Sequence, residues 1–331
     1  MIEARAARSR PMRVVVTGAS GLLGLTLCRS WQGQHHVIGL TRDRALDVPG
    51  VRFEHMDLQA QRDLAPVLAP LEPDLIVHCA AMTSVDGCEQ DPDAAHRLNG
   101  ELPGGIALWC AAHAVRLVHV STDAVFDGVA GDYDERALPN PLNAYARSKL
   151  AGELAVSVAS PGALIARINL FGWSRTGSRS LAEFFVNRLA SGQAVGGFTD
   201  VHFSPLLANY LAQLLLLAGC STISGVRHFA SRDGISKYGF GRMIAEAFGF
   251  DPDLVVPTVS DDMGFAAARP KNLTLDATCV AKELNLVLPT VREGIHDLRH
   301  LEQTGYREEI SPPRGRVRRP DMHGEPTSRT K

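Results

Sequence analysis

Two residues spaced four apart, Tyr145 and Lys149, could work together in proton transfer. They lie in Asn143-Ala-Tyr145-Ala-Arg-Ser-Lys149, which runs into the helix-forming stretch Leu150-Ala-Gly-Glu-Leu-Ala, and side chains four apart on a helix project from one face. An ammonium beside a phenol stabilises the phenolate, so we expect Lys149 to lower the pKa of Tyr145 from about 10. Such a tyrosine can exchange a proton with a carbonyl or an alcohol. The alternative is a surface tyrosine with a solvated lysine, so the neighbouring residues must decide.

A glycine-rich turn near the start of the chain is the first element to consider. The run Arg13-Val-Val-Val-Thr17 predicts a buried strand, Gly18, Gly21 and Gly24 follow, and a helical pattern covers Leu25 to Trp31. Glycines allow backbone to approach a pyrophosphate, and the helix N-terminus supplies N–H groups and a positive dipole. The spacing is GxxGxxG and not the usual GxGxxG, so a turn without a ligand is the alternative. The flanking strand and helix favour a dinucleotide.

The end of the second predicted strand bears on which dinucleotide is bound. His36 to Leu40 predicts that strand, and Thr41-Arg42-Asp43-Arg44 follows it. An acidic residue about twenty positions after the glycine loop binds the ribose hydroxyl of NAD, whereas arginine accommodates the phosphate of NADP. Arg42 and Arg44 favour NADP as the preferred cofactor, and Asp43 leaves NAD as the alternative.

Strands and helices alternate over the first half of the chain. This alternation predicts an α/β protein with a Rossmann-type, doubly wound parallel sheet. Small residues at Ala80 and Ala81, after a strand, would let a flat cofactor lie against the backbone at the carboxyl edge of the sheet. The further elements expected here are strands over 51–54, 74–78, 116–120 and 163–168 and a helix over 92–113.

The strand–helix rhythm stops after Gly172, which suggests a second lobe. We expect residues 12–172 to form the NAD(P)-binding domain, with segments near 203–230 returning to it, and residues 173–306 to form mainly a smaller, C-terminal substrate-binding lobe. Helices are expected over 181–189, 205–217 and 237–248 and a strand over 226–230. Residues 1–11 predict a disordered extension and residues 307–331, rich in proline and arginine, a disordered tail.

Composition excludes several classes of protein. The chain has 331 residues, 45% of them hydrophobic, and a formal net charge of -2, which gives no reason to expect nucleic acid or an anionic membrane as partner. Six scattered cysteines without a CxxC pair indicate reduced thiols and no zinc site, so no metal is expected. The apolar run Leu211 to Ala218 is far shorter than the roughly 20 residues of a membrane span. The first eleven residues lack the apolar stretch of a secretory signal. We therefore expect a cytoplasmic protein.

Together the segments resemble the extended short-chain dehydrogenase/reductase superfamily and, within it, the dTDP-4-dehydrorhamnose reductases. The resemblance covers roughly Met12 to Leu301. The matching segments are Thr17-Gly18-x-x-Gly21-x-x-Gly24, Asp57-Leu58, Ala80-Ala81, Ser121-Thr-Asp-Ala-Val-Phe-Asp-Gly128, Tyr145-Ala-Arg-Ser-Lys-Leu-Ala-Gly-Glu153 and Arg269-Pro-Lys-Asn-Leu-Thr-Leu-Asp276. Each motif alone is of modest specificity, and their order along the chain carries the resemblance.

The resemblance implies a role for each matching residue. Tyr145 would be the proton donor, Lys149 its partner and a ligand of the nicotinamide ribose, and Thr122 the group that binds the reacting oxygen. Asn99 resembles a helix asparagine that supports the lysine. The implied cofactor-binding residues are Gly18, Ser20, Gly21, Leu22, Leu23, Gly24, Arg42, Asp57, Leu58, Ala80, Ala81, Met82, Tyr145 and Lys149, and the implied substrate-binding residues are Thr83, Val85, Thr122, Asp123 and Asn169.

The chain departs from the reductase pattern on the substrate side. Ala124 stands where a tyrosine is common, and Asn169-Leu170-Phe171-Gly172-Trp173 has altered spacing to its tryptophan. Ala124 also cannot act as the glutamate of the related 4,6-dehydratases, which argues against dehydration. Cationic residues of the second lobe are candidates to bind a substrate diphosphate, with ordinary surface charge as the alternative: Arg175, Arg179, Lys237, Arg269 and Lys271.

The function implied is NAD(P)H-dependent reduction of a nucleotide-linked 4-keto-6-deoxy sugar, with Tyr145 as proton donor. A sugar-nucleotide epimerase is an alternative. A second alternative is a nucleotide-binding regulatory subunit resembling the methionine adenosyltransferase β subunit, to which the segment from His228 to Tyr238 is loosely similar. A third is a fold-mate with only a structural role. The expected partner is the sugar nucleotide, and a homodimer is an open option.

Overall fold

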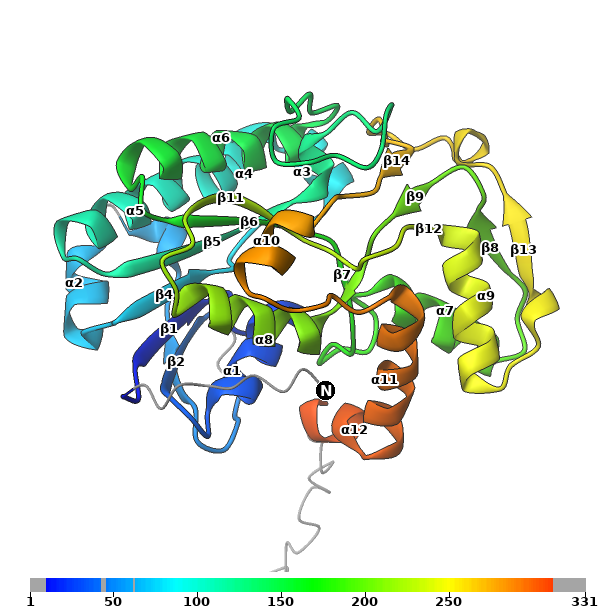
Figure 1. Cartoon of the computed structure of the whole chain (residues 1–331), viewed down its shortest axis with the longest axis horizontal. Coiled ribbons are helices and arrows are strands. Elements are labelled where there is room, and N and C mark those ends of the chain that lie inside the picture. The colour runs from blue at the N-terminus through cyan, green and yellow to red at the C-terminus, as the bar shows by residue number, and fades with distance from the viewer. Residues whose placement is uncertain (1–9, 43–45, 62, 312–331) are drawn as a thin grey trace, which may run out of the picture.

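A seven-stranded parallel sheet forms the centre of the protein (Figure 1). The computed structural model describes residues 10–42, 46–61 and 63–311. The strand order is β11-β6-β5-β4-β1-β2-β3. From β1 the chain first adds strands on one side of the sheet (β2, β3) and then on the other (β4, β5, β6), so a crevice opens between β1 and β4 at the carboxyl ends of the strands. The predicted α/β, doubly wound parallel fold is confirmed. The strands are β1 (Arg13–Thr17), β2 (His36–Thr41), β3 (Arg52–His55), β4 (Leu75–His78), β5 (Arg116–Thr122), β6 (Leu164–Ile168) and β11 (Gly225–Phe229).

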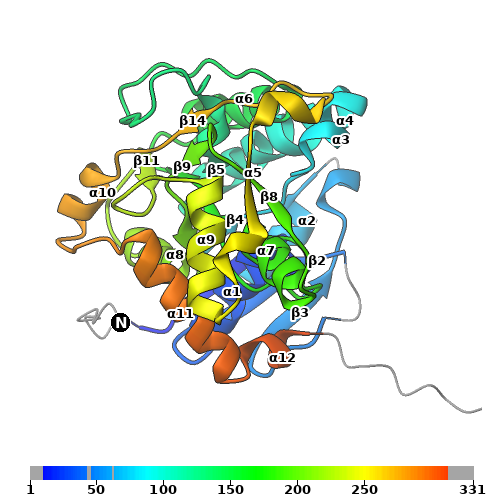
Figure 2. The same ribbon diagram turned by 90° about the vertical axis from the view of Figure 1, so that its right-hand side faces the viewer.

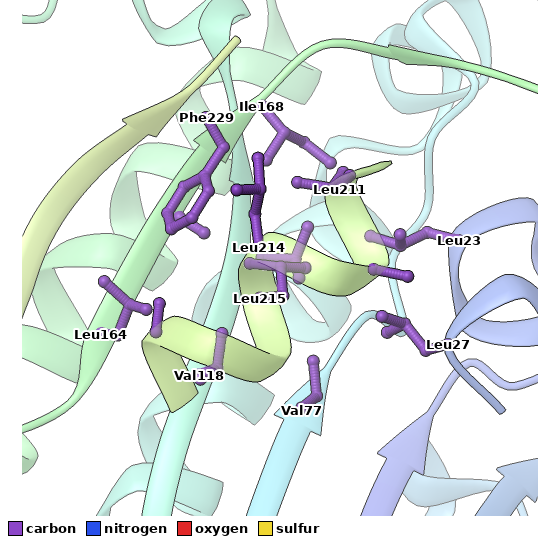
Figure 3. Close-up of a cluster of buried hydrophobic side chains, with 14 of the residues drawn as sticks. Leu23, Leu27, Val77, Val118, Leu164, Ile168, Leu211, Leu214, Leu215 and Phe229 are labelled. Atoms are coloured by element: carbon purple, nitrogen blue, oxygen red, sulfur yellow. The ribbon is translucent and has the colours of Figure 1, made fainter. Parts of the chain in front are cut away.

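Two helices, α1 (Leu22–Trp31) and α8 (Ala208–Gly219), cover one face of the sheet. Figure 3 shows Leu211, Leu214 and Leu215 of α8 against side chains from β4, β5, β6 and β11, with Leu23 and Leu27 of α1 beside them. The strand residues alternate between faces, so Val77 and Val118 point to this side whereas their neighbours point to the other. The apolar stretch that was too short for a membrane span is thus a core helix.

Helices α2 (Ala65–Leu68), α5 (Leu102–Ala112) and α6 (Ala144–Ala159) cover the opposite face. The helix predicted over 92–113 is interrupted: α4 (Pro92–Ala95) passes through a π-helical turn, η3 (His96–Glu101), into α5. This turn packs tightly on α6, since a Cβ added at Gly152 would lie 2.2 Å from the carbonyl oxygen of Asn99. Single π turns inside helices often mark functional sites, and this one carries Asn99.

A second apolar cluster forms the smaller lobe, which faces the viewer in Figure 2. Phe185 of α7 (Leu181–Ala190) and Phe240 and Ile244 of α9 (Lys237–Phe248) are buried at its centre. The other elements of the chain are α3 (Val85–Gln90), β7 (Leu170–Phe171), β8 (Val195–Phe198), β9 (His202–Phe203), β10 (Leu206–Leu207), β12 (Ile235–Ser236), β13 (Val255–Thr258), β14 (Asn272–Leu273), α10 (Thr278–Glu283), α11 (Val291–Gln303) and α12 (Tyr306–Ile310), with 3-10 turns η1 (Leu58–Ala60), η2 (Ala69–Leu71), η4 (Asp123–Val125), η5 (Pro252–Leu254) and η6 (Ser260–Met263).

The predicted disordered tail begins too early. Residues 307–310 belong to α12, because Ile310 is buried and the Arg307 guanidinium lies 4.5 Å from the ring centroid of Trp173. Residues 312–331 and 1–9 lie outside the described residues, whereas Arg10 is described and pairs with Asp74 at 3.3 Å. Within the described ranges, no helix is long and apolar enough to cross a membrane.

Candidate active site

A cleft of about 830 Å³ lies at the carboxyl edge of the sheet and brings together most of the residues that the sequence singled out. They come from the ends of β1, β2, β4, β5 and β6 and from the first turns of α1 and α6. The predicted residues that line the cleft are Gly18, Ser20, Gly21, Leu22, Leu23, Gly24, Arg42, Asp57, Leu58, Ala80, Ala81, Thr83, Thr122, Asp123, Tyr145, Lys149 and Asn169.

The glycine loop forms a close-packed cradle at one end of the cleft. Gly18 has φ +66°, and a Cβ there would lie 2.8 Å from the backbone nitrogen of Ala80; a Cβ at Gly24 would lie 2.3 Å from the carbonyl oxygen of Gly18. Helix α1 begins after Gly21 with neither a side-chain cap nor an acidic residue in its first turn. Free N–H groups and a helix dipole suit a phosphate, so these residues fit the pyrophosphate of a dinucleotide.

The Thr17 hydroxyl joins the ends of β1 and β4 beneath this cradle. Its Oγ1 accepts hydrogen bonds from the backbone nitrogens of Cys79 and Ala80, both at 3.1 Å, and lies 2.8 Å from Nδ1 of His78. The backbone after β4 is therefore held against the glycine loop. The small side chains of Ala80 and Ala81 in this segment leave the space that a flat ring would need.

Helix α6 and strand β5 present the three predicted catalytic side chains. The helix is capped by Asn143, whose Oδ1 accepts from the backbone nitrogen of Ala146 at 2.9 Å, so Tyr145 lies in the first turn and Lys149 one turn later. Both side chains line the cleft together with Thr122 at the end of β5. The Lys149 ammonium donates to the carbonyl of Val120 at 2.7 Å.

The predicted lowering of the Tyr145 pKa is wrong for this structure. Burial raises the pKa of the Tyr145 phenol to about 12, and a hydrogen bond with Thr122 only partly offsets that rise. Lys149 directs its ammonium to a backbone carbonyl, as described above. A phenol that stays protonated near neutral pH suits a proton donor rather than a base.

Lys149 sits above a buried ion pair. Burial lowers the pKa of Lys149 to about 8, and the carboxylate of Glu153, one turn further along α6, raises it. Glu153 is bound by Arg167 of β6, with Nη2 to Oε2 at 2.7 Å, and it accepts a 2.5 Å hydrogen bond from Ser121. The bonds from Arg167 and Ser121 to Glu153 therefore tie α6 to β6 and to β5, one helical turn from Lys149.

Asp123 and Asn169 form a polar pair beside Thr122. Asn169 Nδ2 donates to Asp123 Oδ2 at 2.6 Å, and Thr122 Oγ1 donates to Asp123 Oδ1 at 3.1 Å. Burial nevertheless raises the pKa of the Asp123 carboxyl to about 6. The two residues therefore present a hydrogen-bonding wall whose charge changes in the range of mildly acidic pH.

Two of the predicted residues, Met82 and Val85, are not among the residues that line the cleft. Met82 turns inward and packs against the buried cluster of Cys88, Ala95 and Ala144, and Val85 begins α3. The physical reason lies in Asn99. Its amide binds both the backbone nitrogen (2.8 Å) and the backbone oxygen (3.0 Å) of Met82, and so turns the chain there.

Asn99 supports the site indirectly. Besides Met82, its Nδ2 donates to the Ser148 hydroxyl at 3.0 Å, next to Lys149 in α6. It thus joins the segment after β4 to the helix that carries Tyr145 and Lys149.

Several residues that line the cleft were not anticipated. Most lie at the carboxyl ends of strands, where the rule for open parallel sheets could have found them. They are Leu40, Thr41, Met56, Cys79, Leu98, Val120, Ser121, Ile168, Leu170 and Thr176.

The cationic residues of the second lobe divide into two groups. Arg175 and Arg179 line the cleft. Arg269 instead pairs with Asp86 at 2.9 Å, Lys271 lies 2.7 Å from Asp261, and Lys237 lies 5.6 Å from the ring centroid of Phe198. Asp43 and Arg44, which bear on the choice between NAD and NADP, lie outside the described residues. Across the ranges that are described, no group of three or more His, Cys, Asp or Glu could hold a metal ion.

Comparison with known proteins gives consistent matches over most of the chain. A family model described as the RmlD substrate binding domain matches residues 12–303. The probable low-salt glycan biosynthesis reductase Agl14 of Haloferax volcanii is 36% identical over 291 residues, which cover 86% of this chain and 96% of that protein. Methionine adenosyltransferase 2 subunit beta of Bos taurus is 31% identical over 276 residues, 80% of each chain. The crystal structure of dTDP-4-dehydrorhamnose reductase from Bacillus anthracis in complex with NADP has a TM-score of 0.79, 25% identity, and covers 87% of this chain and 99% of that one.

Proposed function

The chain belongs to the RmlD substrate binding domain family, and from this membership and the geometry of the cleft we propose that it reduces the keto group of a nucleotide-linked 4-keto-6-deoxy sugar. It is an oxidoreductase that uses NAD(P). The proposal draws its substrate class from relatives named as a probable glycan biosynthesis reductase and as dTDP-4-dehydrorhamnose reductase.

The observation that carries the proposal is that Thr122, Tyr145 and Lys149 line the same cleft as the glycine loop from Gly18 to Gly24. A dinucleotide with its pyrophosphate on the glycine loop extends along this cleft towards the three side chains. A sugar carbonyl is bound in front of them. Thr122 is 7% exposed and Lys149 is 3% exposed, so neither is an ordinary surface side chain.

In the proposed reaction, NAD(P)H supplies the hydride that adds to the carbonyl carbon. Tyr145, protonated because burial raises its pKa, donates its proton to the oxygen on which negative charge develops. The Thr122 hydroxyl hydrogen-bonds and orients that oxygen. Lys149, bound to the Val120 carbonyl, places a positive charge near the tyrosinate that remains.

The substrate wall is formed by Asp123 and Asn169, with Ala124 following. Their hydrogen-bonded pair offers a carboxylate and an amide to sugar hydroxyls. Ala124, which follows Asp123, is smaller than the tyrosine that is common there among the reductases that the sequence resembles. We therefore propose that the pocket accepts a sugar with a larger or differently placed substituent at that position.

Tyr145→Phe tests the assignment of the proton donor. We expect NADPH oxidation, followed by absorbance with a panel of keto-sugar nucleotides, to fall at least about 100-fold, the size of a typical general-acid contribution. NADPH affinity measured by calorimetry should change little. If Tyr145→Phe turns over like wild type, Tyr145 is not the donor.

The likeness to methionine adenosyltransferase 2 subunit beta supplies a rival role as a nucleotide-binding subunit. The same experiment separates the two. A wild-type protein that binds NADPH, oxidises it with none of the keto sugars, and co-purifies with a methionine adenosyltransferase would overturn the reductase proposal. Turnover of any keto-sugar nucleotide that depends on Tyr145 supports it.

A further inference from the structure

The cleft has a second wall, contributed by the smaller lobe, that the dinucleotide motif does not account for. This wall is the segment Ser174–Ser180 between β7 and α7, which contributes Arg175, Thr176 and Arg179 to the lining. The segment starts beside the first turn of α1, since a Cβ added at Gly172 would lie 3.4 Å from Cδ2 of Leu22. Residues some 150 positions apart in the sequence therefore flank the same part of the cleft.

The segment is built as a closed loop around one buried carboxylate. Glu183, fully buried in the first turn of α7, accepts hydrogen bonds from the backbone nitrogens of Ser174 (2.6 Å), Arg179 (2.7 Å) and Ser180 (3.1 Å). It also accepts from the Ser174 hydroxyl at 2.7 Å. These neutral donors satisfy the hydrogen-bonding capacity of the buried carboxylate. The loop thus has both its ends fixed.

Arg179 is fixed at its backbone and exposed at its side chain. Among the residues that the structure describes, none forms an ion pair or hydrogen bond with its guanidinium. A cation held at the rim of a cleft without a protein partner is suited to an anion that enters from solvent. A guanidinium binds a phosphate through two parallel hydrogen bonds.

The charges lining the cleft favour an anionic ligand at this end. The described lining residues include four cations, Arg42, Lys149, Arg175 and Arg179, against two carboxylates, Asp57 and Asp123. Arg175 and Arg179 come from the segment that starts beside the first turn of α1, a helix whose N-terminus carries neither a side-chain cap nor an acidic residue. Cations therefore outnumber carboxylates among the described residues that line the cleft.

We propose that Arg179, at the end of the loop closed by Glu183, is a second phosphate-binding element for the dinucleotide and contacts it from the side opposite the glycine loop. The cofactor is then held between the two lobes rather than resting on the Rossmann domain alone. The inference rests on the cofactor site proposed above but not on the identity of the sugar. It also reassigns Arg179 from the substrate diphosphate to the cofactor.

Calorimetric titration of NADPH into Arg179→Ala, with no sugar present, tests the inference. We expect the Kd to rise about 10- to 100-fold, the loss of one charge-assisted contact of roughly 1.5–3 kcal/mol. Arg188→Ala is the matched control, because Arg188 lies in the last turn of α7, the helix that follows Arg179, and pairs with Gln193. Its Kd should equal that of wild type, and Arg179→Lys should fall between the two.

Repeating the titration with NADH shows which phosphate is bound. An equal loss of affinity for NADPH and NADH assigns Arg179 to the pyrophosphate, and a loss confined to NADPH assigns it to the ribose phosphate; both support the inference. A Kd for NADPH within twofold of wild type overturns it, as does a variant whose only defect is a higher KM for the sugar nucleotide. If no keto sugar is reduced while Arg179→Ala still loses NADPH affinity, the proposed substrate fails and the cofactor contact stands.

Discussion

Replacing Asp123 by asparagine should change how the stability of the protein depends on pH. Asp123 is 3% exposed, and burial raises the pKa of its carboxyl from 3.8 to about 6. The folded protein therefore holds this proton more tightly than the unfolded chain does. Its contribution to the free energy of unfolding is largest below pH 4 and is lost as pH rises from about 4 to about 6.

The size of the effect follows from the pKa difference. About two pKa units at 1.36 kcal/mol per unit correspond to about 3 kcal/mol of stability lost above pH 6. Asparagine has nearly the same shape and carries no charge, so Asp123→Asn is free of this loss. The free energy of unfolding of the variant, minus that of wild type, should increase by about 3 kcal/mol between pH 4 and pH 7.

Urea unfolding of the cofactor-free protein at several pH values measures this difference. Any constant offset from altered hydrogen bonds to Asn169 or Thr122 cancels, because only the change with pH is compared. Asp127→Asn is an informative control, since a hydrogen bond from Tyr133 lowers the pKa of Asp127 and its replacement should shift stability with the opposite sign. A difference for Asp123→Asn that stays constant from pH 4 to pH 7 would refute the reasoning. The same variant should lose turnover, because it alters the wall beside Thr122.

Two further predictions concern Lys149 and the ion pair beneath it. Because burial lowers the pKa of Lys149 to about 8 and its charged form stabilises the tyrosinate, kcat should fall about tenfold per pH unit above pH 8; a pH–rate profile that stays flat to about pH 9.5 would contradict this. Glu153→Gln should lower the free energy of unfolding by about 3–5 kcal/mol, since it leaves the buried Arg167 guanidinium unpaired. Urea unfolding should show that the double variant with Arg167→Met recovers much of the loss, and no recovery would mean that the ion pair does not account for it.

Much of the fold followed from local patterns. Short β-branched runs separated by helical patterns predicted a parallel doubly wound sheet, and the strands over 13–17 and 36–41 lie within a residue of where the sequence placed them. The family resemblance drawn from the motifs is also confirmed. The helix expected over 92–113 was wrong at its centre, because its π turn results from packing Asn99 against Gly152, a contact that hydrophobic periodicity does not encode.

In the candidate site, too, the residues that belong to short motifs were predicted from the sequence, whereas features that depend on distant contacts were not. Residues in contiguous motifs, such as the glycine loop and Tyr145 with Lys149, were found because a short spacing defines their geometry. Met82 is not among the residues that line the cleft, and its backbone is bound by the side chain of Asn99, 17 residues away, which the local sequence does not reveal. The pKa of Tyr145 was predicted in the wrong direction because the sequence gives the neighbouring charge but not the burial, which is the larger effect.

The sequence by itself determined the fold class, the glycine-rich turn after β1 and the placement of Tyr145 and Lys149 on one helix. These depend on backbone conformation and on side chains within one or two helical turns, where the spacing of residues along the sequence fixes their relative positions. Only the tertiary structure decided the protonation of Tyr145, Lys149 and Asp123 and brought Arg179 into the same cleft as the glycine loop. Burial and contacts between distant segments arise when the lobes pack together, and no local stretch of the chain contains them.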